Sequence, residues 1–137
     1  MRSIPLLAVL LLPLAAPATA ATPIAGRWLT EEGNAVVTIG ACGNATCGRI
    51  TKLIKGPPSG PPVDRNNPDV RLRGRPLEGL TILTGFADAG DDWRGRIYDP
   101  KSGKTYKSIV RREADGELKV QGCIAFFCRT QKWRAAR

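Results

Sequence analysis

The chain of 137 residues contains no histidine. Neither a Ser-His-Asp triad nor a Cys-His pair can therefore be assembled, and the commonest metal ligand is missing. Carboxylates remain for acid–base chemistry, but many of the twelve occupy turns, where backbone hydrogen bonding accounts for them. The turn carboxylates are Asp91, Asp92, Asp99, Asp115 and Glu117. We expect a protein that is not an enzyme and that holds neither a metal nor a cofactor.

Acidic residues are few beside the basic ones, 12 against 21, which gives a net charge of +9. Aromatic residues make up 6% of the chain and are not interleaved with the basic ones, as stacking platforms for nucleic acid would be. Nucleic acid is therefore not an expected partner. The charge is explained by solubility alone, or by an anionic component of the cell envelope such as a phospholipid headgroup.

Long apolar runs are absent beyond the first twenty residues. Arg2, the apolar stretch 4–14 and the small residues Ala18-Thr19-Ala20 form the pattern of a secretory signal peptide, with cleavage before Ala21. The apolar stretch is too short, and too interrupted by proline, to span a bilayer. We expect a signal peptide at 1–20 and one soluble periplasmic domain at 21–137, with no membrane span.

Four cysteines form two C-x4-C pairs, Cys42 with Cys47 and Cys123 with Cys128. An oxidising compartment favours disulfides over a structural zinc site, and the absence of histidine removes the commonest alternative zinc ligand. Each pair brackets the tip of an expected β-hairpin. In an up-and-down order the two hairpin tips lie at opposite ends of the sheet, too far apart for a bridge between them. Local pairing within each hairpin follows.

Turn signals recur at short intervals between β-rich segments, and no segment has a helical period. Alternation places Arg94 and Arg96 on the outward face of one strand, and Lys119 and Gln121 on that of another. The sequence predicts an all-β fold, an eight-stranded antiparallel up-and-down barrel without open edges. The expected strands are 26–31, 35–42, 47–54, 80–87, 92–98, 104–113, 117–124 and 127–135.

One long loop, residues 55–78, separates the third and fourth expected strands. Its Asp64, Asn67 and Asp69 suit local backbone capping, so we expect an ordered excursion over one end of the barrel. Arg73 and Arg75 fit two interpretations. They either present guanidinium groups to an anionic ligand or pair with the loop's own acids.

The last strand holds a second candidate site. If Trp133 faces inward, alternation turns Arg129 and Gln131 inward too, and buried polar groups need partners. Those partners are either a ligand or groups of the protein itself, with Tyr106 among them. An eight-stranded barrel is either filled by side chains or admits one small ligand.

Three stretches, at 64–86, 95–108 and 118–133, resemble the exported bacterial family called domain of unknown function 2147. The resemblance implies a small periplasmic β-barrel, and the family has no established activity. Gly26-Arg27-Trp28 is also similar to the Gly-x-Trp of lipocalin-like barrels. That similarity implies an arginine late in the chain, Arg129 or Arg134, packed across Trp28, with Trp133 helping to close the barrel.

Two functions remain open. The first is binding of a small amphipathic or anionic molecule at the barrel mouth, by residues from the loop and the inner face of the strands. These candidates are Arg73, Arg75, Tyr106, Arg129 and Gln131. The alternative is a protein-interaction or protease-inhibitor-like module that docks through the loop at 55–78.

Overall fold

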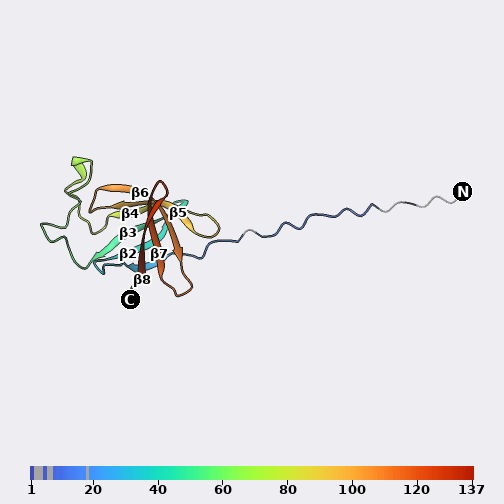
Figure 1. Ribbon diagram of the computed structural model, residues 1–137, viewed down its shortest axis with the longest axis horizontal. Coiled ribbons are helices and arrows are strands. Elements are labelled where there is room, and N and C mark those ends of the chain that lie inside the picture. The colour runs from blue at the N-terminus through green and yellow to red at the C-terminus, as the bar shows by residue number, and fades with distance from the viewer. Residues whose placement is uncertain (2–4, 6–7, 18) are drawn as a thin grey trace.

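The computed structural model describes residues 1, 5, 8–17 and 19–137, and residues 26–135 form a closed antiparallel barrel (Figure 1). Each strand pairs with its neighbour in the chain, and β1 closes the sheet against β8. The predicted up-and-down barrel is confirmed. The strands are β1 Gly26–Leu29, β2 Ala35–Cys42, β3 Ala45–Leu53, β4 Thr81–Asp88, β5 Trp93–Asp99, β6 Lys104–Arg112, β7 Leu118–Ile124 and β8 Phe127–Ala135.

The first strand ends two residues earlier than expected, at Leu29. Thr30 starts a turn there, because its carbonyl accepts from the backbone N–H of Gly33 at 2.8 Å. Its hydroxyl donates to Asn34 Oδ1 at 2.7 Å. Side-chain hydrogen bonds of this kind compete with the strand ladder and favour a turn.

Alternation along the strands builds one apolar core inside the barrel. The side chains of Trp28, Phe86 and Trp133 are each at most 2% exposed. Val37, Val110 and Leu118 pack between them in the same cluster. Trp93 and Ile97 of β5 pack against this cluster from their inward positions. Successive side chains of a strand point to opposite faces, so Arg94 and Arg96 are directed outward.

Two glycines mark where this interior is tightest. A Cβ on Gly48 would lie 2.8 Å from Leu83, and one on Gly95 would lie 2.6 Å from both Phe86 and the carbonyl oxygen of Thr84. Real Cβ atoms do not approach this closely, so only glycine fits. At these levels the barrel interior is filled by side chains.

Both predicted disulfides are present, Cys42–Cys47 and Cys123–Cys128. Cys123 and Cys128 stand directly opposite each other in the β7–β8 hairpin, with Cα atoms 4.1 Å apart. The first pair is diagonal, because Cys47 is opposite Gly40 rather than Cys42, and its Cα atoms are 5.6 Å apart. Both separations lie in or near the range that a disulfide requires.

Residues 21–25 cover the end of the barrel where β1 begins. The indole of Trp28 donates to the carbonyl of Ile24 at 2.9 Å, and that of Trp93 donates to Thr22 at 2.9 Å. Ile24 is 1% exposed beneath them. The backbone N–H of Ala21 donates to both carboxylate oxygens of Asp88, each at 3.1 Å.

The arginine over Trp28 is Arg112 of β6, 5.1 Å from the ring centroid, and not Arg129 or Arg134. Register explains the difference. Ala135 is the β8 residue opposite Trp28, so Arg134 projects from the other face of the sheet and Arg129 lies six positions up the strand, about 20 Å away. The expected arginine contact on Trp28 therefore comes from β6 and not from β8.

Part of the expected signal peptide, including Arg2, Ile4 and Ala18, lies outside the described residues. Among the described residues there is no helix long and apolar enough to cross a membrane. Residues 8–17 extend away from the barrel and are exposed (Figure 1).

Gly95→Ala tests whether the interior is filled. We expect it to lower the free energy of unfolding by about 1–3 kcal/mol, because the added methyl meets Phe86 and a backbone carbonyl. Gly40→Ala is the matched control, since a Cβ there meets nothing within 4 Å. Urea unfolding of both variants decides the question, and equal stabilities would mean that the interior has spare room.

Candidate functional site

Asp64 is the centre of the long loop and is 0% exposed. Its Oδ2 accepts from Arg75 Nε and from Asn67 Nδ2, both at 2.9 Å, and its Oδ1 accepts from Tyr98 Oη at 2.5 Å. Tyr98 belongs to β5, so the carboxylate ties the loop to the barrel wall. A buried carboxylate needs several such partners to offset its loss of hydration.

This contact changes the acidity of Tyr98. Burial, then the hydrogen bond to Asp64 and the charge of that carboxylate, raise the pKa of Tyr98 to about 12. The neutral phenol is therefore the form that the fold favours, since it alone donates to Asp64. Tyr98 acts here as a structural donor at neutral pH.

Charged groups of the loop are largely paired within it. Arg73 donates from Nε to the carbonyl of Asn67 at 2.7 Å, and Asn67 Oδ1 accepts from the backbone N–H of Asp69 at 2.8 Å. Asp69 accepts from the side chain of Arg71, which holds the pKa of Asp69 below its usual value. Of the two interpretations of Arg73 and Arg75, these contacts match internal pairing.

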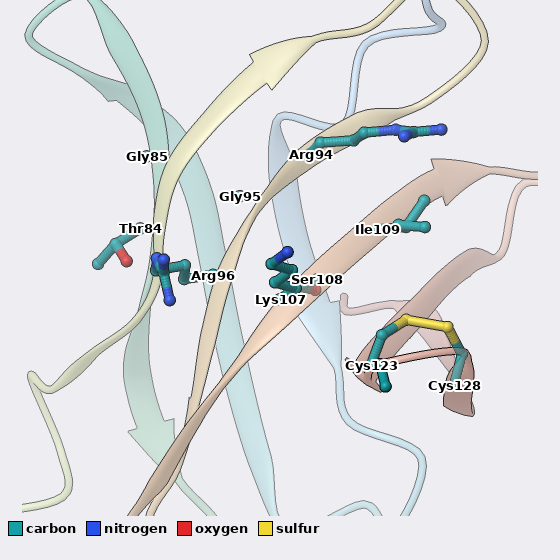
Figure 2. Close-up of a pocket in the computed structure, with 11 residues that line it drawn as sticks. Thr84, Gly85, Arg94, Gly95, Arg96, Lys107, Ser108, Ile109, Cys123 and Cys128 are labelled. Carbon is teal, nitrogen blue, oxygen red and sulfur yellow. A yellow bond between two sulfur atoms is a disulfide. The ribbon is translucent and has the colours of Figure 1, made fainter.

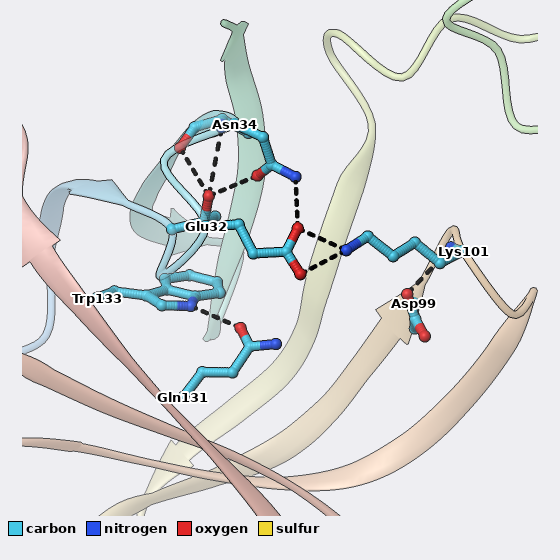
Figure 3. A network of polar contacts seen from close by, with 8 residues as sticks. Glu32, Asn34, Asp99, Lys101, Gln131 and Trp133 are labelled. Carbon is cyan, nitrogen blue, oxygen red and sulfur yellow. Dashed lines mark hydrogen bonds and ion pairs between the residues drawn. The ribbon is translucent and has the colours of Figure 1, made fainter. Parts of the chain in front are cut away.

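The barrel mouth is crossed by an ion pair between two turns on opposite walls. Lys101, after β5, donates to Glu32, after β1, at 2.6 Å from Nζ to Oε1 (Figure 3). Beneath it, Trp133 Nε1 donates to Gln131 Oε1 at 2.9 Å. The inward-facing Gln131 thus has a partner within the protein.

The five predicted ligand residues do not converge. Tyr98, which donates to Asp64 of the loop, follows the inward-facing Ile97 in β5 and so points outward. Tyr106 is the β6 residue opposite Ile97 and therefore faces the interior. Arg73 and Arg75 therefore lie with the loop on the outer side of the wall. The other three project from the inner faces of their strands: Tyr106, Arg129 and Gln131.

A groove that the sequence reasoning missed lies on the outer face of β4 to β7, with a volume of about 620 Å³ (Figure 2). It opens where the β4–β5 register shifts between Thr84 and Ala87. Gly85 makes this bulge possible, because its φ of 64° lies in the left-handed region that other residues rarely adopt. The Cys123–Cys128 disulfide and Ala125 form the opposite rim.

The groove is lined by three cationic side chains, Arg94, Arg96 and Lys107. Arg96 and Lys107 stand directly opposite each other on adjacent strands, where like charges repel (Figure 2). Asp92 neutralises Arg94, with 3.0 Å between Nε and Oδ1, and raises its pKa. Within the described residues, no salt bridge joins Arg96 or Lys107 to a carboxylate.

The sequence contained only part of the pattern that identifies this groove. Alternation placed Arg94 and Arg96 outward, yet only the strand register brings Lys107 beside Arg96. Within the described residues, no group of three or more Cys, Asp or Glu side chains is placed to hold a metal ion. The chemistry that this groove can perform is binding of an anion.

Fold and surface together define a lipocalin-like barrel with an external cationic groove. The chain belongs to the family described as an uncharacterized protein conserved in bacteria, domain of unknown function 2147, whose model matches residues 26–135. No curated protein matches it. Among solved structures it resembles protein HP1028 from the human pathogen Helicobacter pylori, described as belonging to the lipocalin family. The TM-score is 0.73, with 21% identity over 85% of each chain, so this likeness shows the fold alone.

Tyr98 titration tests the loop network. In Tyr106→Phe, Tyr98 is the one remaining tyrosine, and its tyrosinate absorbance should appear with a midpoint of about 12 rather than about 10. Because the folded pKa is raised, its contribution to stability is complete below pH ~10 and is lost as the pH rises towards 12. A midpoint near 10 in the folded protein would contradict the buried contact with Asp64.

Proposed function

We propose that this protein is an exported, non-enzymatic binding domain that takes a small anionic or amphipathic ligand. The ligand site is the cationic groove on the outer face of β4 to β7, rather than the barrel mouth anticipated from the sequence. The observation that carries the proposal is the unneutralised pair Arg96 and Lys107 at the groove. Two like charges held side by side cost stability unless an anion bridges them.

The shape of the groove supports an amphipathic ligand. Ile109, Ala125 and the Cys123–Cys128 disulfide add apolar surface beside the two cations. A phosphate or carboxylate would accept hydrogen bonds from Arg96 and Lys107 while a short hydrocarbon lies against this surface. The packed core at the level of Gly48 and Gly95 argues against a ligand in the interior.

Binding is favoured over catalysis by the state of the buried carboxylate. Asp64 is engaged by three donors and is shielded from solvent, so it has no free position for a substrate proton. The docking of a protein partner through residues 55–78 is supported less. The charged groups of that segment, including Arg71 and Arg75, are used for internal pairing.

Export and processing before Ala21 are part of the proposal. Ala21 is 7% exposed and its N–H contacts Asp88, whereas residues 8–17 are exposed. Cleavage there would convert this N–H into an ammonium group facing a carboxylate, so that the new terminus closes the lower end of the barrel. The two disulfides also suit an oxidising compartment.

Hexyl phosphate, a monomeric anionic amphiphile, tests the groove. We expect it to shift the backbone NMR signals of β5, β6 and the rim at Cys123 and Ala125. Arg96→Gln and Lys107→Gln should each weaken binding by about tenfold, since each removes a charge-assisted hydrogen bond. Arg49→Gln, the same change at an exposed position of β3, should leave the affinity unchanged. If Arg49→Gln weakens binding equally, the net charge of the protein and not the groove accounts for the binding.

The terminus is tested by comparing a chain that begins at Ala21 with one that carries a single extra residue before it. Asp88→Asn should destabilise the first by about 0.5–1 kcal/mol more than the second, because only the first places its ammonium group on the carboxylate. Mass spectrometry of protein secreted from the full-length precursor should show Ala21 as the first residue. Cleavage elsewhere would contradict the processing site, and equal effects of Asp88→Asn in the two chains would contradict the ammonium–carboxylate contact.

A further inference from the structure

The tip of the β7–β8 hairpin is apolar and exposed. Phe126 is 105% exposed, Phe127 84% and Ile124 63%, at the end of a hairpin that Cys123–Cys128 holds closed. Exposed aromatic side chains in contiguous sequence are uncommon on soluble proteins and mark a contact surface. The disulfide keeps these side chains projecting from the barrel instead of folding back onto it.

The two residues of the turn at this tip, Ala125 and Phe126, do not favour a tight hairpin turn. Ala125 has φ = 51°, and among the described residues it is the one non-glycine in the left-handed region. Two-residue hairpin turns favour Asn and Gly at such positions. The other disulfide hairpin follows that preference, with Gly43 and Asn44 at its tip and φ = 65° at Gly43. The β7–β8 hairpin has apolar residues at its tip in place of residues that favour the turn conformation. This departure indicates a functional constraint.

The tip stands at the edge of a cationic sheet face. Register aligns the outward positions of β5 to β8 in rows, Arg96 with Lys107 and Cys123, and Arg111 with Lys119 and Lys132. Every residue of these four strands is described, and none of their outward positions holds a carboxylate. The outward cations are Arg94, Arg96, Lys107, Arg111, Lys119, Lys132 and Arg134.

We propose that this face docks on an anionic lipid bilayer, with Phe126 and Phe127 inserted among the headgroups and the cations of β5 to β8 lying over the lipid phosphates. The inference extends the proposed function, because a headgroup phosphate would occupy the groove between Arg96 and Lys107. Ala125 and the disulfide line that groove, so the tip and the anion site share one rim.

Charge complementarity selects the bilayer as the partner. A broad positive surface attracts anionic headgroups, and apolar side chains that project beyond it reach the acyl boundary. A second copy of this chain would bring the same cations to face each other and be repelled. One apolar hairpin tip, closed by Cys123–Cys128, suits peripheral, reversible attachment rather than a membrane span.

Vesicle sedimentation tests the proposal with the processed chain, residues 21–137, with both disulfides formed. The protein should sediment with phosphatidylglycerol vesicles and remain in solution with phosphatidylcholine vesicles, and added salt should release it. Phe126→Ser with Phe127→Ser should weaken vesicle binding by about a hundredfold, from the transfer of two aromatic side chains. Lys119→Gln with Lys132→Gln should weaken it by about tenfold. Arg49→Gln with Lys52→Gln, two exposed positions of β3, is the charge-matched control.

A variant with a more favourable turn sequence distinguishes a membrane-binding role of the tip from a structural role. Ala125→Asn with Phe126→Gly should make the protein more resistant to urea while it weakens vesicle binding. A purely structural tip would show the reverse, lower stability with vesicle binding intact, and would overturn the proposal.

The hexyl phosphate experiment keeps the two proposals apart. Phe126→Ser with Phe127→Ser should bind hexyl phosphate as the parent does, since neither side chain lines the groove. Binding of hexyl phosphate without binding of anionic vesicles would overturn the membrane inference and leave the groove intact. Vesicle binding that depends on both phenylalanines, without hexyl phosphate binding, would support docking and refute the groove. Concentration-dependent dimerisation abolished by the phenylalanine substitutions would assign the tip to a second copy and overturn the proposal.

Discussion

Closure of the sheet around a core that fills it is the constraint on which the other features depend. Eight strands enclose a space that side chains can fill, and Trp28, Phe86 and Trp133 are buried in it. The two glycines at which a methyl would collide show how little room remains at their levels. A barrel packed in this way offers its outer wall and its turns for recognition, and the cationic groove and the apolar hairpin both lie there.

The outer wall is divided into regions with different chemistry. The long loop lies against β5, where Asp64 anchors it to Tyr98. Beside it, the bulge at Gly85 opens the groove, and the basic rows of β5 to β8 continue from the groove towards the lower end. Paired charges thus hold the loop in place, whereas Arg96 and Lys107 have no salt bridge to a carboxylate within the described residues and form the surface that we propose as the binding site.

The fold could be predicted from the sequence because its determinants are local. Alternating residues, turn residues every few positions and cysteines five residues apart each report on one strand or one hairpin. Arg112 over Trp28 could not be predicted in this way, since the contact depends on register accumulated around the barrel. The pairing of Arg96 with Lys107 and the contact of Asp64 with Tyr98 likewise join segments that no short-range pattern relates. The candidate ligand residues, predicted from the loop and from alternation along the strands, lie on two faces of the wall, because neither pattern shows which segments meet.

The pairing of β1 with β8 also has a consequence for the order of assembly. The seam joins Trp28 and Leu29 to Ala135 and Arg134, so the barrel cannot close until nearly the whole chain is present. Contacts between distant parts of a chain form slowly, whereas a hairpin closed within a few residues forms early. The two disulfide hairpins can therefore become covalently fixed while the seam is still open. During that interval the chain is an open sheet with two free edges, and Arg129, Lys132 and Arg134 of its last strand keep one of those edges from pairing with another molecule.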